Sequence, residues 1–534
     1  MLAVCSSAGA NENRAPAPEG KRSKLGEAFF ADPTIREFDL RISETDLAQL
    51  SQSPRTYVSA ELREGETVLT NVGVHLKGAS SFRTIDLKPS FAIKFDQFVE
   101  DQTYRGLKKL MFNNSVQDRT YVSELLATEL FRDAGLPASR VTHARLRLNG
   151  RDLGLYVVVE AMNKDFLKRE FGNGKGNLYE AFLQDLDGRV EQDNGDDESR
   201  EDLRALCNVC AIADPAKRWE QLNKTLDVER FASFIAMELL TGHWDGYAIH
   251  FNNYRLYHDP ETDRMVFIPH GLDSLFRRPD VSIDPPLTSI VVKAVLTTPE
   301  GRALYDQQLR KVAKTVFKAP LILERMDKAL TKLRGAGLTP ADLAKIERYA
   351  SAMRERIELR EVRVGEQLRG VKPQTVKVDA AGILYPTSWR DEPDRGDPLF
   401  DRVKRDGKET LHIRALQEST KASWRSQVFL QPGSYRFEGR ARTESLNSGS
   451  ARLRISADNA SMAISGNSPW GTLQHDFIVE GSAMDIELIC ELYARDGDVW
   501  FDLASLRVKR LGPAETDPVR KPIFQRPSRI NLNR

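Results

Sequence analysis

The chain has 534 residues, which is long enough for two or three domains of ordinary size. Its 78 Lys and Arg residues nearly balance its 77 Asp and Glu residues, and this balance argues against a nucleic-acid partner. No stretch approaches the roughly 18 consecutive apolar residues that a membrane-spanning helix needs, so no transmembrane segment is expected.

The start of the chain is small, polar and proline-containing, and we predict a disordered segment over residues 1–33. Within it, Leu2 to Cys5 resembles a bacterial lipoprotein cleavage site, although the charged and long apolar regions that normally precede such a site are missing. This stretch favours an exported protein at the cell surface or otherwise outside the cytoplasm.

Residues 34–98 alternate apolar and polar side chains, which predicts several β-strands. Two of these strands are joined by a loop through Gly78, Ser80 and Ser81. The backbone amides of such a loop can cradle phosphates, with the hydroxyl groups assisting. A plain hairpin connection is the alternative.

The strand at the end of this region carries Lys94. A period of two places Phe91, Ile93 and Phe95 on one face and Lys94 on the other. An apolar-Ala-apolar-Lys strand is similar to the Val-Ala-Ile-Lys strand whose Lys holds the nucleotide phosphates in protein kinases. The alternative is an ordinary solvated lysine.

Residues 119–140 carry apolar side chains at helical spacing, and this helix contains two acids, Glu124 and Glu129. Either acid is able to pair with Lys94, as the acid of the corresponding helix does in kinases. The hairpin that follows ends in a strand that runs into a linker at Glu160. An adenine would lie beside such a linker between two lobes, so Glu160 is a candidate nucleotide contact.

Two further features are expected to be structural. Cys207 and Cys210 lack the second pair that would complete a zinc site, so they form either a local disulfide or two buried thiols. Residues 191–203 are strongly acidic and are predicted to be a solvated loop and a helix start.

Residues 242–276 combine a helix end, a loop, a hairpin and two acids in unlike settings. Asp245 opens the loop, Asn252 and Asn253 close it, and Asp273 follows the predicted hairpin. Phosphoryl transfer needs one carboxylate to orient the acceptor and a pair of oxygen ligands to hold Mg²⁺ on the phosphates. The alternative is that both acids are turn or cap residues.

The composition changes after Pro373. Residues 298–370 are predicted to be helical, whereas residues 375–511 contain short alternating runs separated by Gly, Asn and Pro, as in an antiparallel sandwich. This part resembles jelly-roll carbohydrate-binding modules. Three aromatic side chains are candidates for stacking on sugar rings or for the core of the sandwich, namely Trp424, Trp470 and Tyr493. Residues 512–534 are predicted to be a disordered tail.

Residues from about 35 to 370 resemble the CotH-type kinases, named for a bacterial spore-coat protein and also found as fungal surface proteins. The motifs that carry the resemblance are VGVHLKGASSF, KPSFAIKF, GLKKLMFNN, YVSELLATELFRDAGLPASR, LNGRDLGLYVVVE, KDFLKREFG with GNLYE, HWDGYAIHFNNYRLYHDP and FIPHGLDSLF. The resemblance implies an α+β chain: a diverged, two-lobed protein-kinase-like fold over residues 34–372, followed by the sandwich.

The resemblance also implies an enzyme that uses ATP and Mg²⁺ to phosphorylate Ser or Thr of secreted or surface proteins. By motif, Lys94 is the phosphate-binding Lys, Asp245 the catalytic-loop Asp and Asp273 a metal ligand. Asn253 is the second metal ligand, and Asn252 stays a candidate because Asp245 and Asn253 are eight positions apart, against about five in ordinary kinases. A non-catalytic surface or carbohydrate-binding protein on a kinase-like scaffold is the alternative function.

Overall fold

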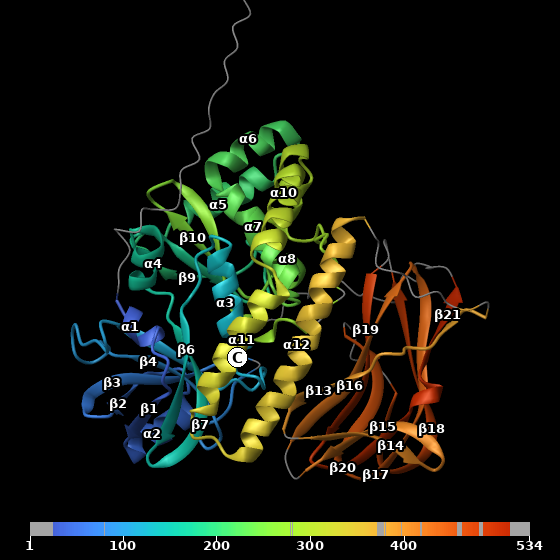
Figure 1. Ribbon diagram of the computed structural model, residues 1–534. Helices are drawn as coiled ribbons and strands as arrows, with labels where there is room; N and C mark the ends of the chain where they lie inside the picture. Colours follow the sequence, from blue (N-terminus) through green and yellow to red (C-terminus); the bar gives the residue numbers. More distant parts are fainter. Residues whose placement is uncertain are drawn as a thin grey trace, which may run out of the picture. The chain divides into compact units, whose positions relative to one another are not determined.

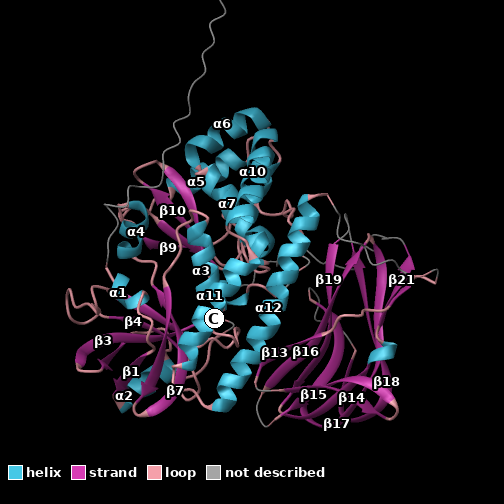
Figure 2. Cartoon of the chain, viewed as in Figure 1, coloured by secondary structure: helices cyan, strands magenta, loops and turns pink. Residues whose placement is uncertain are grey.

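The computed structural model describes residues 25–79, 81–277, 279, 281–370, 379, 381–396, 398–416, 419–456, 462–479 and 484–512. The chain divides into two compact units, Met1–Gly370 and Val371–Arg534, of which the second is drawn in orange to red (Figure 1). Within the described residues, the α-helices belong to the first unit and the second consists mainly of strands (Figure 2). The expected mixture of helices and sheets is therefore confirmed.

A closed barrel forms the N-terminal part of the first unit, with strand order β1-β2-β3-β4-β5-β7-β6. Its strands are β1 (Arg36–Ile42), β2 (Val58–Glu64), β3 (Thr67–Lys77), β4 (Ser90–Lys94), β5 (Lys109–Asn113), β6 (Val141–Leu148) and β7 (Arg151–Glu160). Helix α2 (Glu44–Gln52) joins β1 to β2. Alternate apolar side chains fill the barrel, and Val74, Ile93 and Leu110 are fully buried there.

Strand β4 has the two faces that its sequence predicts. Phe91, Ile93 and Phe95 are fully buried in the barrel core, whereas Lys94 is partly exposed. The pairing of His75 with Ala92 and of Gly73 with Lys94 puts these side chains on the outer face of the barrel sheet. The same face therefore carries Lys77, at the end of β3.

The predicted disordered segment is too long at its C-terminal end. Residues 27–30 form helix α1 (Glu27–Phe30), and Phe29 lies in the barrel core with 1% of its surface exposed. Its ring makes edge contacts with Phe38 and Tyr104, and this apolar burial holds the segment in place. The lipoprotein-like residues 2–5 lie outside the described part of the chain.

A sheet and a set of helices form the rest of the first unit. The 4-stranded sheet has the order β11-β10-β8-β9. Its strands are β8 (Leu178–Ala181), β9 (Val190–Asn194), β10 (Tyr254–Asp259) and β11 (Arg264–Pro269). The helices are α3 (Ser123–Asp133), α4 (Lys164–Phe171), α5 (Glu201–Cys210), α6 (Pro215–Thr225), α7 (Val228–Thr241), α8 (Tyr247–His250), α9 (Ile290–Leu296), α10 (Pro299–Thr315), α11 (Ala319–Arg334) and α12 (Pro340–Leu368). The predicted hairpin is confirmed as antiparallel β10 and β11.

Helix α7 positions the loop that follows it. Asp227 caps its N-terminus by accepting a hydrogen bond from the backbone N–H of Arg230, and nearly all side chains from Val228 to Thr241 are buried. Gly242 ends the helix in the left-handed region, at φ 67°. The chain therefore turns sharply before His243.

Cys207 and Cys210, on α5, are free thiols, so the thiol alternative holds and no disulfide joins them. Helix α5 begins at Glu201, where the acidic stretch predicts a helix start. The stretch is not simply solvated, because the side chain of Asp202 is only 8% exposed and accepts hydrogen bonds from Tyr179 and Asn177.

The second unit is an antiparallel sheet structure with its own apolar core. Its strands are β12 (Ile383–Leu384), β13 (Arg390–Arg395), β14 (Leu399–Arg405), β15 (Lys408–Ala415), β16 (Thr420–Leu430), β17 (Gly433–Ile455), β18 (Ala463–Val479), β19 (Met484–Ala494), β20 (Asp496–Asp502) and β21 (Arg507–Gly512). Trp424 belongs to the core, with 5% of its surface exposed. Tyr493 is 44% exposed, and Trp470 is partly exposed and donates a hydrogen bond to Asp406.

Among the helices that the structure describes, none has both the length and the apolar character needed to cross a membrane.

Candidate functional site

The first part of the site is a chain of polar contacts between the barrel and helix α3. The Nζ of Lys77 donates to Oδ1 of Asn113 at 2.5 Å, and Nδ2 of Asn113 donates to Oε2 of Glu124 at 2.9 Å. Burial lowers the pKa of Lys77, and the negative charges of Glu124 and Asp273 oppose that shift. The amide therefore bridges a half-buried lysine and a buried acid.

Lys94 lies on the same face of the sheet as Lys77 but further along it. It pairs across the sheet with Gly73 on one side and with Lys109 on the other. Gly73 is four residues before Lys77, which is about 13 Å along a strand. The structure therefore places Lys77, and not Lys94, beside Glu124 and Asp273.

The short 3-10 helix η2 (Leu272–Ser274) carries Asp273 and is fastened to the start of α3. The Oγ of Ser123 donates to the carbonyl of Leu272 at 3.3 Å and accepts from the N–H of Leu275 at 3.3 Å. Ser123 is itself buried. Asp273 and Glu124 are thereby held close together on two elements that are far apart in sequence.

The surroundings of Asp273 oppose the negative charge of its carboxylate. Burial raises its pKa to about 7, and the negative charges of Glu124 and Asp245 add to this effect. Within the described chain, no hydrogen bond supports the Asp273 side chain. A positive charge placed beside it would relieve both the burial and the repulsion.

Asn253 lies against the segment that leads to Asp273. Its Nδ2 donates to the carbonyl of Asp245 at 3.3 Å, and its Oδ1 packs so closely on Gly271 that a Cβ there would collide with it. Gly271 also has φ 60°, a backbone conformation that favours glycine. Both the close contact with Asn253 and the backbone conformation therefore require glycine at this position. Asn252 points elsewhere, because its Oδ1 accepts from the N–H of Leu183 at 3.2 Å.

Asp245 faces a fully buried histidine. The Oδ1 of Asp245 lies 3.4 Å from Nε2 of His243, and Nδ1 of His243 lies 3.4 Å from Oε1 of Glu238. Burial opposes the positive charge of His243, but the Glu238 and Asp245 carboxylates outweigh it and raise the His243 pKa. Glu238 also accepts from the backbone N–H groups of Tyr247 and Ala248, both at 2.9 Å, so it fixes the start of α8.

We call six of these residues the central cluster. Its members are Lys77, Asn113, Glu124, Asp245, Asn253 and Asp273. The sequence predicted four of them as site residues and missed Lys77 and Asn113. Both stand inside motifs noted in the sequence, VGVHLKGASSF and GLKKLMFNN, where Lys77 ends β3 and Asn113 ends β5, the two strands that flank β4.

Two acids predicted as site candidates lie outside the central cluster. Glu129 is 3.8 Å from Arg325, on the other side of α3. Glu160 is 4% exposed and is held by Arg140 at 2.6 Å and Arg169 at 2.7 Å. Burial works to raise the pKa of Glu160, but the two guanidinium groups lower it below its usual value. The Glu160 carboxylate is therefore occupied by these two arginines.

The predicted phosphate loop begins directly after Lys77. Gly78 has φ 104°, and its carbonyl accepts a hydrogen bond from Arg55. Ser81 offers its carbonyl to Nδ2 of Asn114 at 3.0 Å, and Ser80 lies outside the described residues. The loop thus adjoins the central cluster.

Arg255, on β10, is a further charged residue near the central cluster. The sequence alone did not single it out. Arg255 forms ion pairs with Glu180, across the sheet on β8, and with Asp193 at 2.6 Å, on β9. Burial and then the charge of Arg255 lower the pKa of both Lys109 and His270. The positive charge of Arg255 is therefore felt at Lys109 and at His270.

The donor set of the central cluster fits a hard divalent cation. Asp273 and Asn253 offer carboxylate and amide oxygens, which are the ligands that Mg²⁺ prefers, and the Oδ1 of Asp245 is buried without a hydrogen-bond partner. Within the described part of the chain, no three His, Cys, Asp or Glu side chains are placed to hold a metal by themselves. A cation here would take further oxygens from a ligand such as a phosphate.

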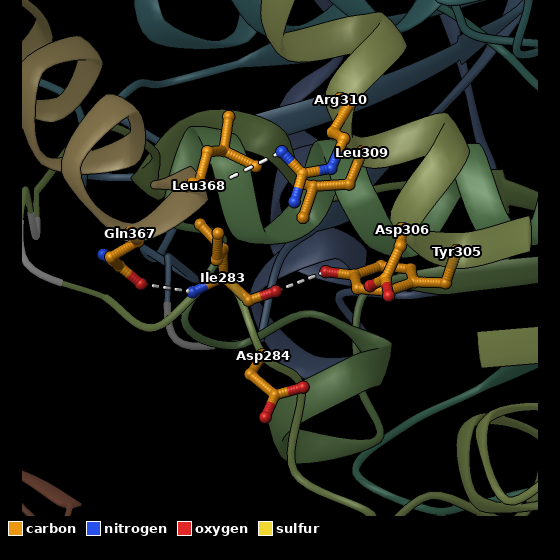
Figure 3. Close-up of a pocket in the computed structure, with 8 residues that line it drawn as sticks. All are labelled: Ile283, Asp284, Tyr305, Asp306, Leu309, Arg310, Gln367 and Leu368. Carbon is orange, nitrogen blue, oxygen red and sulfur yellow. Dashed lines mark hydrogen bonds between the residues drawn. The ribbon is translucent and has the colours of Figure 1, made fainter. Parts of the chain in front are cut away.

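A pocket of about 200 Å³ lies elsewhere in the first unit (Figure 3). Its lining residues are Ile283, Asp284, Tyr305, Asp306, Leu309, Arg310, Gln367 and Leu368. The backbone of Ile283 accepts from the Tyr305 hydroxyl and donates to Gln367 at 2.9 Å, which ties the chain after β11 to α10 and α12. The pocket contains no residue of the central cluster.

Comparison with known proteins finds a bacterial spore coat protein and fungal invasins among the relatives. The chain is 22% identical over 249 residues to the inner spore coat protein H of Bacillus subtilis, which covers 44% of this chain and 67% of that protein. It is 23% identical over 248 residues to invasin CotH2 of Rhizopus delemar, which covers 39% of this chain and 41% of that protein. The chain thus spans less than half the length of this fungal relative.

Two solved structures are similar to separate parts of the chain. The Helicobacter pylori proinflammatory kinase CtkA matches 55% of this chain and 93% of its own, at 9% identity and a TM-score of 0.27. The carbohydrate-binding module TmCBM61, solved with β-1,4-galactotriose, matches 26% of this chain and 97% of its own, at 17% identity and a TM-score of 0.19. At these TM-scores neither likeness carries an argument.

The family model described as CotH kinase protein matches residues 74–361, which is more than half of the chain. The match includes all six residues of the central cluster. The chain therefore belongs to the CotH kinase family.

Proposed function

We propose that the chain is a CotH-type protein kinase that transfers the γ-phosphate of ATP, with Mg²⁺, to Ser or Thr of secreted or surface proteins. The observation that carries the proposal is the convergence of one half-buried lysine, three acids and two amides in the central cluster. A scaffold has no need of two carboxylates, Asp273 and Glu124, that burial holds at raised pKa values.

The roles follow from the contacts. Lys77, positioned by Asn113 and Glu124, holds the phosphates, a role that the motif alone would give to Lys94. Asp273 and Asn253 hold Mg²⁺, which would neutralise phosphate charge when bound. Asp245, oriented by His243, accepts the proton of the acceptor hydroxyl.

The test is phosphate transfer by the whole chain. Purified protein is incubated with γ-labelled ATP and Mg²⁺, with EDTA in a parallel sample, and acid-stable label is located by mass spectrometry. Asp245→Asn should keep nucleotide affinity and lose turnover, while Asp101→Asn, whose side chain is 84% exposed, serves as the matched control. If the wild type binds nucleotide but labels neither itself nor an added surface protein, the non-catalytic alternative is the better account.

The second unit is proposed to bind a polysaccharide and so place the kinase on a coat or cell surface. The exposed ring of Tyr493 supports this, because an aromatic face in water is a common platform for a sugar ring. Tyr493→Ala should reduce retention of the chain on a panel of insoluble polysaccharides without lowering its melting temperature. Equal retention of the variant on every polysaccharide would contradict the proposal.

A further inference from the structure

Arg255 occupies a place where a guanidinium group needs an explanation. It is 9% exposed, and its neighbours across β11 and further along β10, Ile268 and Tyr257, are fully buried in an apolar cluster with α4. A buried arginine is costly unless its donors are satisfied. Its two Nη groups meet Glu180 and Asp193, but its Nε is buried with no hydrogen-bond partner.

The two carboxylates fix the guanidinium from two sides. Glu180 and Asp193 stand on β8 and β9, which pair with each other and, through β8, with β10, so the clamp is built on the sheet itself. Two acids that bind the Nη groups of an arginine fix its planar guanidinium, so the flat face of the guanidinium keeps one orientation. Such a face stacks on nucleobases.

The position along the site matches the nucleoside end of a nucleotide. Arg255 is two residues after Asn253, about 7 Å along an extended chain, and its charge acts on both Lys77 and Lys109 of the barrel sheet. A nucleotide whose terminal phosphates lie at Lys77 and Asp273 would therefore direct its nucleoside toward Arg255. Both Nη groups of Arg255 already pair with Glu180 and Asp193, so a phosphate would have to displace a carboxylate to bind them.

Resting on the proposed function, we infer that Arg255 contacts the base of the bound nucleotide. The guanidinium, braced by Glu180 and Asp193, carries the base on its flat face. This makes Arg255 a determinant of nucleotide affinity that is separate from the phosphate-binding Lys77.

The test is a series of nucleotides with the same base and different phosphate numbers. Calorimetry with AMP, ADP and ATP at fixed Mg²⁺ compares the wild type with Arg255→Ala and Arg255→Lys. The lysine variant keeps a positive charge between the two acids, so it covers the case in which the alanine variant does not fold. Arg334→Lys is the matched control, because Arg334 is 52% exposed and pairs with Glu347 away from the central cluster.

A base contact predicts the same fold-loss for all three nucleotides, roughly 5- to 30-fold, since this is the range of a cation–π contact. The lysine variant should lose affinity as well, because it lacks the flat face. A loss that grows from AMP to ATP would make Arg255 a phosphate ligand and overturn the inference, and so would unchanged affinity in Arg255→Lys. If the wild type binds none of the three nucleotides, the result contradicts the proposed function itself and not only the base contact.

Discussion

Replacing Asp273 by Asn should stabilise the metal-free protein. The substitution keeps the shape of the side chain and removes a charge that burial and two neighbouring acids oppose. The step from the ordinary pKa of 3.8 to about 7 corresponds to a ceiling of roughly 4 kcal/mol, at ~1.4 kcal/mol per pH unit. Asp273 is only partly buried, so water screens the charge, and we expect a gain of about 1–2 kcal/mol at pH 8.

The sign of the pH dependence is fixed by the raised pKa. In the folded wild type Asp273 keeps its proton up to about pH 7, whereas in the unfolded chain it loses it near 3.8. The wild type therefore loses stability as the pH rises from about 4 to about 7, and the advantage of Asp273→Asn grows over the same window. At pH 5 the advantage should be less than half of its value at pH 8.

The assay is urea unfolding at pH 5 and pH 8 without divalent cations. The transition to monitor is the one that shifts in the wild type when Mg²⁺ and nucleotide are added. Added Mg²⁺ and nucleotide should stabilise the wild type and leave Asp273→Asn nearly unchanged, which reverses their order. Asp101→Asn is the control and should match the wild type throughout. The reasoning is refuted if Asp273→Asn is less stable than the wild type at pH 8 without metal, or if its advantage is equal at the two pH values.

Three further outcomes are expected. Mg²⁺-dependent nucleotide affinity should fall by up to about tenfold per pH unit below pH 7, because the Asp273 proton competes with the cation, and calorimetry between pH 6 and pH 8 checks this. Lys77→Ala should lower phosphoryl transfer by about 100-fold or more while Lys94→Ala stays within a few-fold, and the opposite order in a labelled-ATP assay would restore the role to Lys94. Trp424→Ala should cost about 3–5 kcal/mol of stability, since its ring lies in the core, whereas Trp470→Ala should change the melting temperature little; comparable losses in the two variants would be inconsistent with their burial.

Local patterns predicted much of the fold. The β10–β11 hairpin and helix α7 follow from alternation, turn residues and helical spacing that lie within a few residues of each other. The two faces of β4 follow from a period of two. In each case the decisive signal is local, so the sequence suffices.

The identity of the lysine could not be predicted in this way. Lys77 and Lys94 lie on the same face of one sheet, and alternation alone does not distinguish them. Which one meets Glu124 depends on the register of β3 against β4 and on where α3 packs, and both are set by contacts between distant parts of the chain. The same holds for Glu160, whose arginine partners lie 20 and 9 residues away.

The Ser123 hydroxyl also limits how such an enzyme can be regulated. Because it bonds both ends of η2, a rotation of α3 away from the barrel would pull Leu272 and Leu275 with it and displace Asp273 at the same time. Glu124, which is linked to Lys77 through Asn113, and Asp273, the proposed metal ligand, would then be displaced together. A state that moves the helix and keeps η2 in place would have to break both hydrogen bonds, so an inactive state that retains them moves the two elements together.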